Sequence, residues 1–246
     1  MAPDRDEHPV AAWTRLRETK GRAATIIDLY RLAAAPRGLQ PHELPREERL
    51  ALARSVVPAI WPGWEITGGS ERADPITVVE YDDGWPAGFE YWRDRVASAL
   101  GPGARRIEHV GSTAVPGLPA KPIVDIQVSV TDMQDESAYV PDLEGIGLQL
   151  RSRDALHRYF RPFPDEPRDV HVHVCEVGSN WEREHLLFRD YLRIHQHDAS
   201  RYARTKRAAA RRWADDGWAY TDAKSDVILG ILDRAELWAA AHGWQP

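Results

Sequence analysis

Apolar residues recur at helical spacing along the first seventy residues. Ile26, Leu29, Tyr30 and Ala33 share one helical face, and the segment 35–38 (APRG) supplies a stop. The predicted helices cover residues 10–20, 22–34 and 45–58. A stretch rich in glycine, proline and tryptophan follows, and we place a boundary near residue 72.

Beyond this boundary, short β-branched runs alternate with amphipathic segments. The predicted strands cover residues 76–79, 105–110, 123–130, 147–151, 157–162 and 170–176. Helices are predicted over 87–100 and over a short stretch after Asp132. Another helix begins near 181 and is interrupted near 197–198, and the last runs from an N-cap at Thr221 to 238. Strands that follow each other without a helix indicate a mixed or antiparallel sheet. The sequence therefore predicts an α+β protein: a helical N-terminal extension over 1–72 and a sheet domain, covered by helices, over 73–246.

A run from residue 107 to 128 combines small residues, prolines and a carboxylate between two predicted strands. Gly111, Ser112 and Thr113 are small enough for backbone N–H groups and two hydroxyls to approach phosphate oxygens. Asp125 could hold Mg²⁺ on the following strand, and Lys121 could add a positive charge. The spacing is equally compatible with a tight loop in which Asp125 only caps or hydrogen-bonds a neighbour.

Histidines occupy alternate positions of the predicted strand 170–176. His171 and His173 therefore share one face with Cys175. One imidazole could act as a metal ligand, phosphate donor or general base, whereas the structural alternative places both at the sheet surface. His109, two residues before the Gly-Ser pair, has the same two interpretations.

The segment 181–212 is locally basic in an acidic chain. Arg189 and Arg193 are four residues apart, so they share a helical face, and so do Tyr202 and Lys206. These cations could clamp a triphosphate or another polyanion. The alternative is a solvated helix face with pairs such as Asp190 with Arg193.

The run GSTAVPGLPAKPIVDI, the later HVHV, the FRDYLR segment and the Tyr202–Lys206 spacing resemble the GrpB family. The resemblance covers roughly residues 74 to 238, and the family's fold is similar to that of polymerase-beta type nucleotidyltransferases. It implies a nucleotidyltransferase-like sheet and adds weight to a nucleotide site. The residues assigned to nucleotide binding are His109, Gly111, Ser112, Thr113, Arg189, Arg193 and Lys206. Those assigned to catalysis are Asp125, His173 and Lys121.

One position departs from the nucleotidyltransferase pattern. Gln127 stands where the pattern has a second acid, and two Mg²⁺ ions need several carboxylates. Glu108 or Glu176 could supply the missing charge. We therefore expect Mg²⁺ at Asp125, Gln127 and Glu108, or a nucleotide bound without chemistry.

The amino-acid composition excludes several other classes of protein. Of 246 residues, 43% are hydrophobic, the net charge is −6, and Cys175 is the single cysteine. These values fit a globular cytoplasmic protein and exclude an internal disulfide or a cysteine-based zinc site. The start lacks a signal-peptide pattern, and no run of about 18 apolar residues indicates a membrane span. The acidic balance disfavours nucleic acid as a partner.

Three functional hypotheses follow. The first is a Mg²⁺-dependent nucleotidyl- or phosphoryl-transfer enzyme that acts on a nucleotide and an unknown small-molecule acceptor. The second is an inactive nucleotide- or coenzyme-binding accessory protein, because GrpB-like domains are fused to dephospho-coenzyme A kinase in some bacteria. The third is an interaction platform that forms a homo-oligomer through the N-terminal helices. Walker and Rossmann glycine motifs and the nucleophile elbow are absent from the sequence.

Overall fold

The computed structural model describes residues 8–20, 24–61, 63–67 and 75–246, and the chain divides into two compact units. We call the first the N-terminal unit; it comprises residues 1–62, 73–76 and 205–226. The second, the sheet unit, comprises 63–72, 77–204 and 227–246.

The N-terminal unit is helical, as predicted, but it includes a segment from much later in the chain. Its α-helices in the described residues are α1 (Pro9–Lys20), α2 (Ile26–Ala34), α3 (Arg46–Ile60), the second half of α7 (Gln196–Arg212) and α8 (Gly217–Asp222). Asp222 accepts a hydrogen bond from the backbone N–H of Ile27 (3.0 Å), and the buried Arg49 pairs with Asp215 (2.7 Å). These bonds tie 205–226 to the N-terminal helices, so the division differs from the predicted boundary at residue 72.

Two local features of residues 45–80 differ from the prediction. Helix α3 continues through Pro58 to Ile60, since a proline near the helix end removes only one backbone donor. Residues 65–66 form the short strand β1 (Glu65–Ile66), whereas Val79 makes only an isolated bridge with Ala120 instead of the predicted strand.

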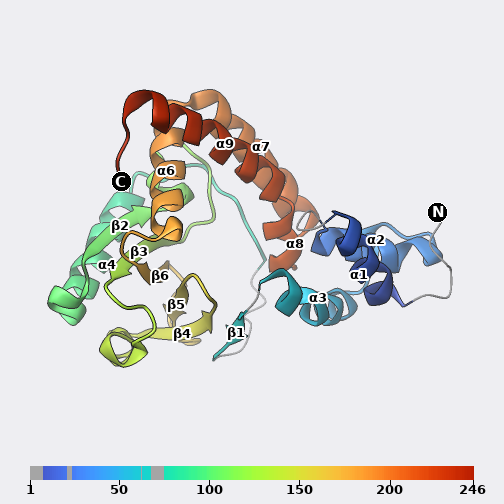
Figure 1. The fold of residues 1–246 in the computed structure, drawn as a ribbon, viewed down its shortest axis with the longest axis horizontal. Coiled ribbons are helices and arrows are strands. Elements are labelled where there is room, and N and C mark those ends of the chain that lie inside the picture. Colours follow the sequence, from blue (N-terminus) through green and yellow to red (C-terminus); the bar gives the residue numbers. More distant parts are fainter. Residues whose placement is uncertain (1–7, 21–23, 62, 68–74) are drawn as a thin grey trace. The chain divides into compact units, whose positions relative to one another are not determined.

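The sheet unit contains one mixed sheet, which confirms the α+β prediction. The strand order is β1-β4-β5-β6-β3-β2, and only the β3–β6 pair is parallel. The strands after β1 are β2 (Arg106–Val110), β3 (Val124–Val130), β4 (Leu148–Arg153), β5 (Arg158–Pro162) and β6 (Val170–Glu176). Figure 1 shows β2, β3 and β6 side by side, so β2 forms one edge of the sheet.

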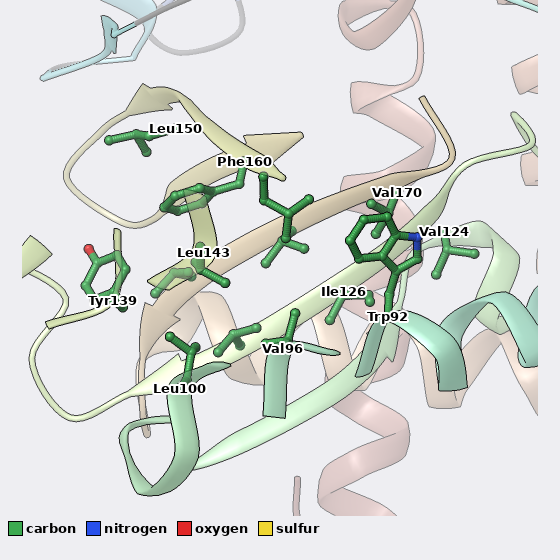
Figure 2. Packing of buried hydrophobic residues seen from close by; sticks show 14 of the residues in the cluster. Trp92, Val96, Leu100, Val124, Ile126, Tyr139, Leu143, Leu150, Phe160 and Val170 are labelled. Atoms are coloured by element: carbon green, nitrogen blue, oxygen red, sulfur yellow. The ribbon is translucent and has the colours of Figure 1, made fainter. Parts of the chain in front are cut away.

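Alternation along β3 and β6 separates an apolar face from a polar one. Val172 belongs to the apolar cluster of this face. Figure 2 shows Ile126 in the same cluster with Trp92 of α4 (Trp85–Leu100) and Leu143 of α5 (Val140–Gly145). The opposite face carries polar side chains and is covered by α6 (Asn180–Ile194). Ser129 on this face donates a hydrogen bond to Glu182 of α6 (2.5 Å).

A second apolar cluster fixes the loop after β2. Val115 and Leu118 of this loop pack in one cluster with Leu187 of α6, with the first half of α7 (Gln196–Arg212) and with α9 (Ser225–His242). The predicted interruption near 197–198 lies between Ile194 and Gln196. The segment of the predicted last helix is divided between α8, which ends at Asp222, and α9, which begins at Ser225. The N-cap is Asp216, at the start of α8, and Thr221 lies inside α8.

None of the helices in the described parts of the chain is long and apolar enough to cross a membrane.

The core assignment predicts the effect of Ile126→Ala. Ile126 is fully buried, so the substitution should lower the free energy of unfolding by about 2–5 kcal/mol through lost burial and a cavity. Chemical denaturation measures the change. The control Leu229→Ala, at a 60% exposed position, should change it by less than about 0.5 kcal/mol. Equal losses in the two variants would contradict the placement of the core.

Candidate functional site

Gly111 brings the loop after β2 against the carboxylate of Asp125. Val110 is the register partner of Asp125, and Gly111 directly follows it. The backbone of Gly111 has φ +69°, and a Cβ atom built there would overlap the Asp125 carboxylate. Only glycine therefore suits this position, and the predicted proximity of the Gly-Ser pair and the aspartate is present.

The hydroxyls of the loop are engaged by protein side chains. Oγ1 of the buried Thr113 lies 2.9 Å from Nε2 of His109. Ser112 hydrogen-bonds Tyr202, and burial nevertheless raises the pKa of Tyr202 to about 12. Tyr202 is thus a loop contact that we did not assign to the site from the sequence, although its four-residue spacing from Lys206 drew attention to it.

Asp125 lies beside two histidines of β6. Its Oδ1 is 3.2 Å from Nδ1 of His171 and 3.8 Å from Nε2 of His173. The carboxylate is 31% exposed. Burial opposes its ionisation, but the hydrogen bonds from His171 and His173 outweigh burial and hold the pKa of Asp125 well below its usual range. Of the two histidines, His171 makes the shorter contact, whereas the sequence interpretation selected His173.

Two cationic side chains lie near the pair formed by Asp125 and His171. Arg168, in the loop before β6, donates from Nε to Nε2 of His171 (3.3 Å). Lys121 interacts electrostatically with Asp125, and burial lowers its pKa from the usual value. Burial also lowers the pKa of His171 to about 4, so this imidazole is neutral at pH 7. Lys121 thus lies near Asp125, its role in catalysis stays a prediction, and Arg168 is an addition that the sequence did not indicate.

The donors around Asp125 do not fit a pair of divalent cations. Within the described residues, no group of three or more His, Cys, Asp or Glu side chains could hold a metal ion. Gln127 is fully buried, Glu108 pairs with Arg189 (2.7 Å), and Glu176 is exposed at the end of β6. Two Mg²⁺ ions would face mostly neutral ligands there. Mg²⁺ binding by Asp125, Gln127 and Glu108 stays a prediction.

A cavity of about 330 Å³ opens where the edge strand β2 meets α4 and α6. It brings together five of the predicted site residues. These are Glu108, His109, Thr113, Arg189 and Arg193. Tyr81 and Phe89 add aromatic surface, and the Phe89 ring stacks on His109 with a centroid distance of 4.8 Å. Burial, with help from Arg193 and Arg189, lowers the pKa of His109 to about 4.

The two arginines of the cavity have different environments. Arg189 donates to Glu108 (2.7 Å), to the backbone oxygen of His109 (3.1 Å) and to Asp190 (2.7 Å), and its side chain is 11% exposed. Arg193 donates from Nε to the Ala114 carbonyl (3.0 Å) and is 40% exposed. Arg189 therefore anchors β2 to α6, whereas Arg193 presents its guanidinium to the cavity.

Lys206 does not belong to this cavity. It lies on α7 in the N-terminal unit, and its side chain is 2% exposed.

A stack of aromatic rings extends the polar face beyond the predicted residues. Trp181 lies 3.6 Å from His185, 5.5 Å from His173 and 5.1 Å from His157 between ring centroids. Burial lowers the pKa of His185 to about 4, against its hydrogen bond to the Trp181 backbone. No local sequence signal marks this cluster, because its members come from β6, from α6 and from the turn before β5.

Fold and site together define an α+β protein with a Gly-Ser loop held against an aspartate of a mixed sheet. Residues 75–234, more than half of the chain, match the family model described as "GrpB protein". The chain belongs to the GrpB family, as its sequence motifs predicted.

Similar proteins span the same region. A UPF0157 protein of Streptomyces coelicolor is 46% identical over 171 residues, which cover 70% of this chain and 89% of that protein. A dephospho-CoA kinase of Mycolicibacterium paratuberculosis is 31% identical over 198 residues, which cover 70% of this chain and 49% of the kinase. The crystal structure of GrpB from Enterococcus faecalis aligns with a TM-score of 0.59 at 30% identity, and covers 66% of this chain and 99% of that one.

The close approach of Gly111 to Asp125 predicts unequal effects of substitution at two glycines of one loop. Gly111→Ala and Gly117→Ala both place a Cβ at positive φ, but only at Gly111 would the Cβ meet other atoms. Gly117→Ala should lower the free energy of unfolding by about 1 kcal/mol, and Gly111→Ala by about 1–3 kcal/mol more. Denaturant titration measures both changes. Equal losses would show that Gly111 is not held against Asp125.

The buried histidines predict a loss of stability in mild acid. The pKa of His109, His171 and His185 is lowered to about 4, while an unfolded histidine titrates near about 6.5. The unfolded state therefore takes up protons first, and the free energy of unfolding should fall between these values, by roughly 1 kcal/mol per histidine at about pH 5.5. Denaturation at a series of pH values measures the slope.

Two variants test the assignment of this slope to buried imidazoles. His185→Gln should flatten the pH dependence, and His197→Gln, at an 89% exposed side chain, should leave it unchanged. A slope that is the same in all three proteins would contradict the role of His185.

Proposed function

We propose that this protein binds a nucleotide or another phosphorylated small molecule at the β2-edge cavity and the adjoining Gly-Ser loop. One observation carries the proposal. A cavity of about 330 Å³ joins aromatic surface from Tyr81 and Phe89 to the guanidinium of Arg193. A volume of this order suits a small ligand, and an apolar wall with a few charged groups is typical of such sites.

Arg193 supplies the anion-binding group. Its Nε and Nη1 contact Ala114 and Asp190, which fixes the side chain while 40% of it stays exposed. Burial and the nearby Arg189 lower the pKa of Arg193 from its usual value, and both effects favour an added negative charge at this place. A phosphate or carboxylate would accept charge-assisted hydrogen bonds from this guanidinium.

The relatives support a ligand of the nucleotide or coenzyme class. The similar protein of Mycolicibacterium paratuberculosis carries the name dephospho-CoA kinase, and the chain aligns with about half of it. We therefore include dephospho-coenzyme A among the candidate ligands, beside the four nucleoside triphosphates. In this proposal the protein acts as an accessory binding protein.

Transfer chemistry is a second candidate, and the position of Gly111 favours it. The backbone of the Gly-Ser loop lies directly against the carboxylate of Asp125 at Gly111, which is the arrangement that the nucleotidyltransferase resemblance implies. Incubation with each nucleoside triphosphate, Mg²⁺ and a panel of acceptors, followed by chromatography, tests it. Turnover that is lost in Asp125→Asn supports transfer, and no turnover leaves the binding proposal as the function.

Self-association through the N-terminal helices stays a hypothesis. Removal of residues 1–72 would strip partners from Asp215 and Asp222, so sedimentation of the full chain is the suitable measurement.

The binding proposal predicts the effect of Arg193→Gln. Calorimetric titration with ATP, CTP, GTP, UTP and dephospho-coenzyme A should show binding by the wild type to at least one ligand. Arg193→Gln should weaken that binding about ten-fold or more through loss of a charge-assisted contact.

Arg183→Gln is the matched control. Arg183 lies on the same helix and is 38% exposed, but it pairs with Glu236 and does not line the cavity. Binding that is equally weakened in both variants would reflect net charge, and no binding by the wild type would reject the proposal.

A further inference from the structure

The side chains of β3 and β6 beside Asp125 are neutral, and Glu108, opposite Gln127 on β2, is paired with Arg189 (2.7 Å). Gln127 follows Asp125 on the same face of β3, and the register partners of these two residues on β6 are His171 and His173. The carboxylate of Asp125 is thus surrounded by one amide and two imidazoles. A hard cation such as Mg²⁺ prefers several charged oxygen ligands.

His171 has no lone pair to offer a cation. Its Nε2 accepts the hydrogen bond from Nε of Arg168 (3.3 Å), so the ring proton of the neutral imidazole is on Nδ1. Nδ1 then donates this proton to Oδ1 of Asp125 at 3.2 Å. Both ring nitrogens are used, and the dyad is fixed in the direction Arg168 to His171 to Asp125.

Neither His173 nor Gln127 supplies a metal ligand in place of His171. Nε2 of His173 faces Asp125 at 3.8 Å and donates its proton to the carboxylate, so the lone pair of this ring is on Nδ1, on the other side of the ring. Gln127 is fully buried, and neither atom of its side-chain amide has a hydrogen-bond partner among the described residues. An amide oxygen brings no negative charge to offset a cation.

Two cationic side chains of the protein lie beside Asp125 and His171. Lys121 interacts electrostatically with Asp125 and with His171, and Arg168 holds the far side of His171. These two cationic side chains lie beside the single carboxylate of Asp125. An anion is attracted to such a place without a metal ion.

We propose that the site around Asp125 receives a second anionic group of the ligand bound by Arg193, through Lys121 and Arg168 and without a divalent cation. This inference deepens the proposed function, and its ligand-binding test rests on that function. Asp125 then orients His171 and accepts a hydrogen bond, instead of coordinating metal.

The first experiment uses the metal alone and needs no knowledge of the ligand. Mn²⁺, a spectroscopic substitute for Mg²⁺, is titrated with wild-type protein, and the free-ion signal is followed by electron paramagnetic resonance. The inference predicts that the wild type leaves the free Mn²⁺ signal unchanged. Stoichiometric Mn²⁺ binding that is lost in Asp125→Asn would overturn it.

Gln127→Glu is the matched variant for this titration. It adds a second carboxylate on the same strand face, and we expect it to acquire Mn²⁺ binding. If this variant fails to fold, the wild-type titration still decides the inference, because that result alone supports or overturns it.

The second experiment measures nucleotide affinity by calorimetry in EDTA and in Mg²⁺. We expect affinity in EDTA to equal or exceed that in Mg²⁺, since free Mg²⁺ neutralises the phosphates that Lys121 and Arg168 would contact. Lys121→Gln and Arg168→Gln should each weaken binding about ten-fold, and Arg105→Gln, at an exposed position of the sheet unit, should not.

The outcomes separate the two proposals. Binding about ten-fold tighter in Mg²⁺ than in EDTA would overturn the inference while leaving the proposed function intact. No nucleotide binding under either condition would reject the proposed function, and the Mn²⁺ titration would then decide the inference by itself.

Discussion

The parallel pairing of β3 with β6 is the constraint on which the site depends. Its register sets Asp125 opposite His171 and Gln127 opposite His173, while Ile126 and Val172 point to the apolar face. A shift of one residue in either strand would turn that strand's polar side chains into the core. The apolar packing of α4 therefore fixes the chemistry on the other face of the sheet.

This pairing also decides the charge balance. Asp125 is ionised beside imidazoles that burial keeps neutral, and Lys121 and Arg168 supply the compensating charge. A partly buried carboxylate is stable only with hydrogen bonds or opposite charge. Here β6 provides the hydrogen bonds, and the segments before β3 and β6 provide the charge.

Much of the fold could be predicted because its signals are local. Alternation in β3 and β6 and the helical spacing in α2 and α4 reflect burial of single elements, and Gly111 with Asp125 reflects a short motif. Contacts between distant segments carry no such signal. Asp222 caps α2 across 195 residues, so the boundary of the N-terminal unit could not be placed from composition. The contacts of His171 with Asp125 and Arg168 depend likewise on strand register.

Arg189 and Arg193 show why spacing alone does not assign function. Their four-residue separation puts both on one face of α6, and in sequence they are equivalent. In the structure Arg189 donates hydrogen bonds to Glu108 and to the His109 carbonyl, and these contacts join α6 to the edge strand. Arg193 lies one turn further along and bonds the Ala114 carbonyl of the loop after β2, and its side chain stays 40% exposed in the same cavity. The end of a strand, which no pattern on the helix records, separates an arginine engaged by the sheet from one that is exposed to the cavity.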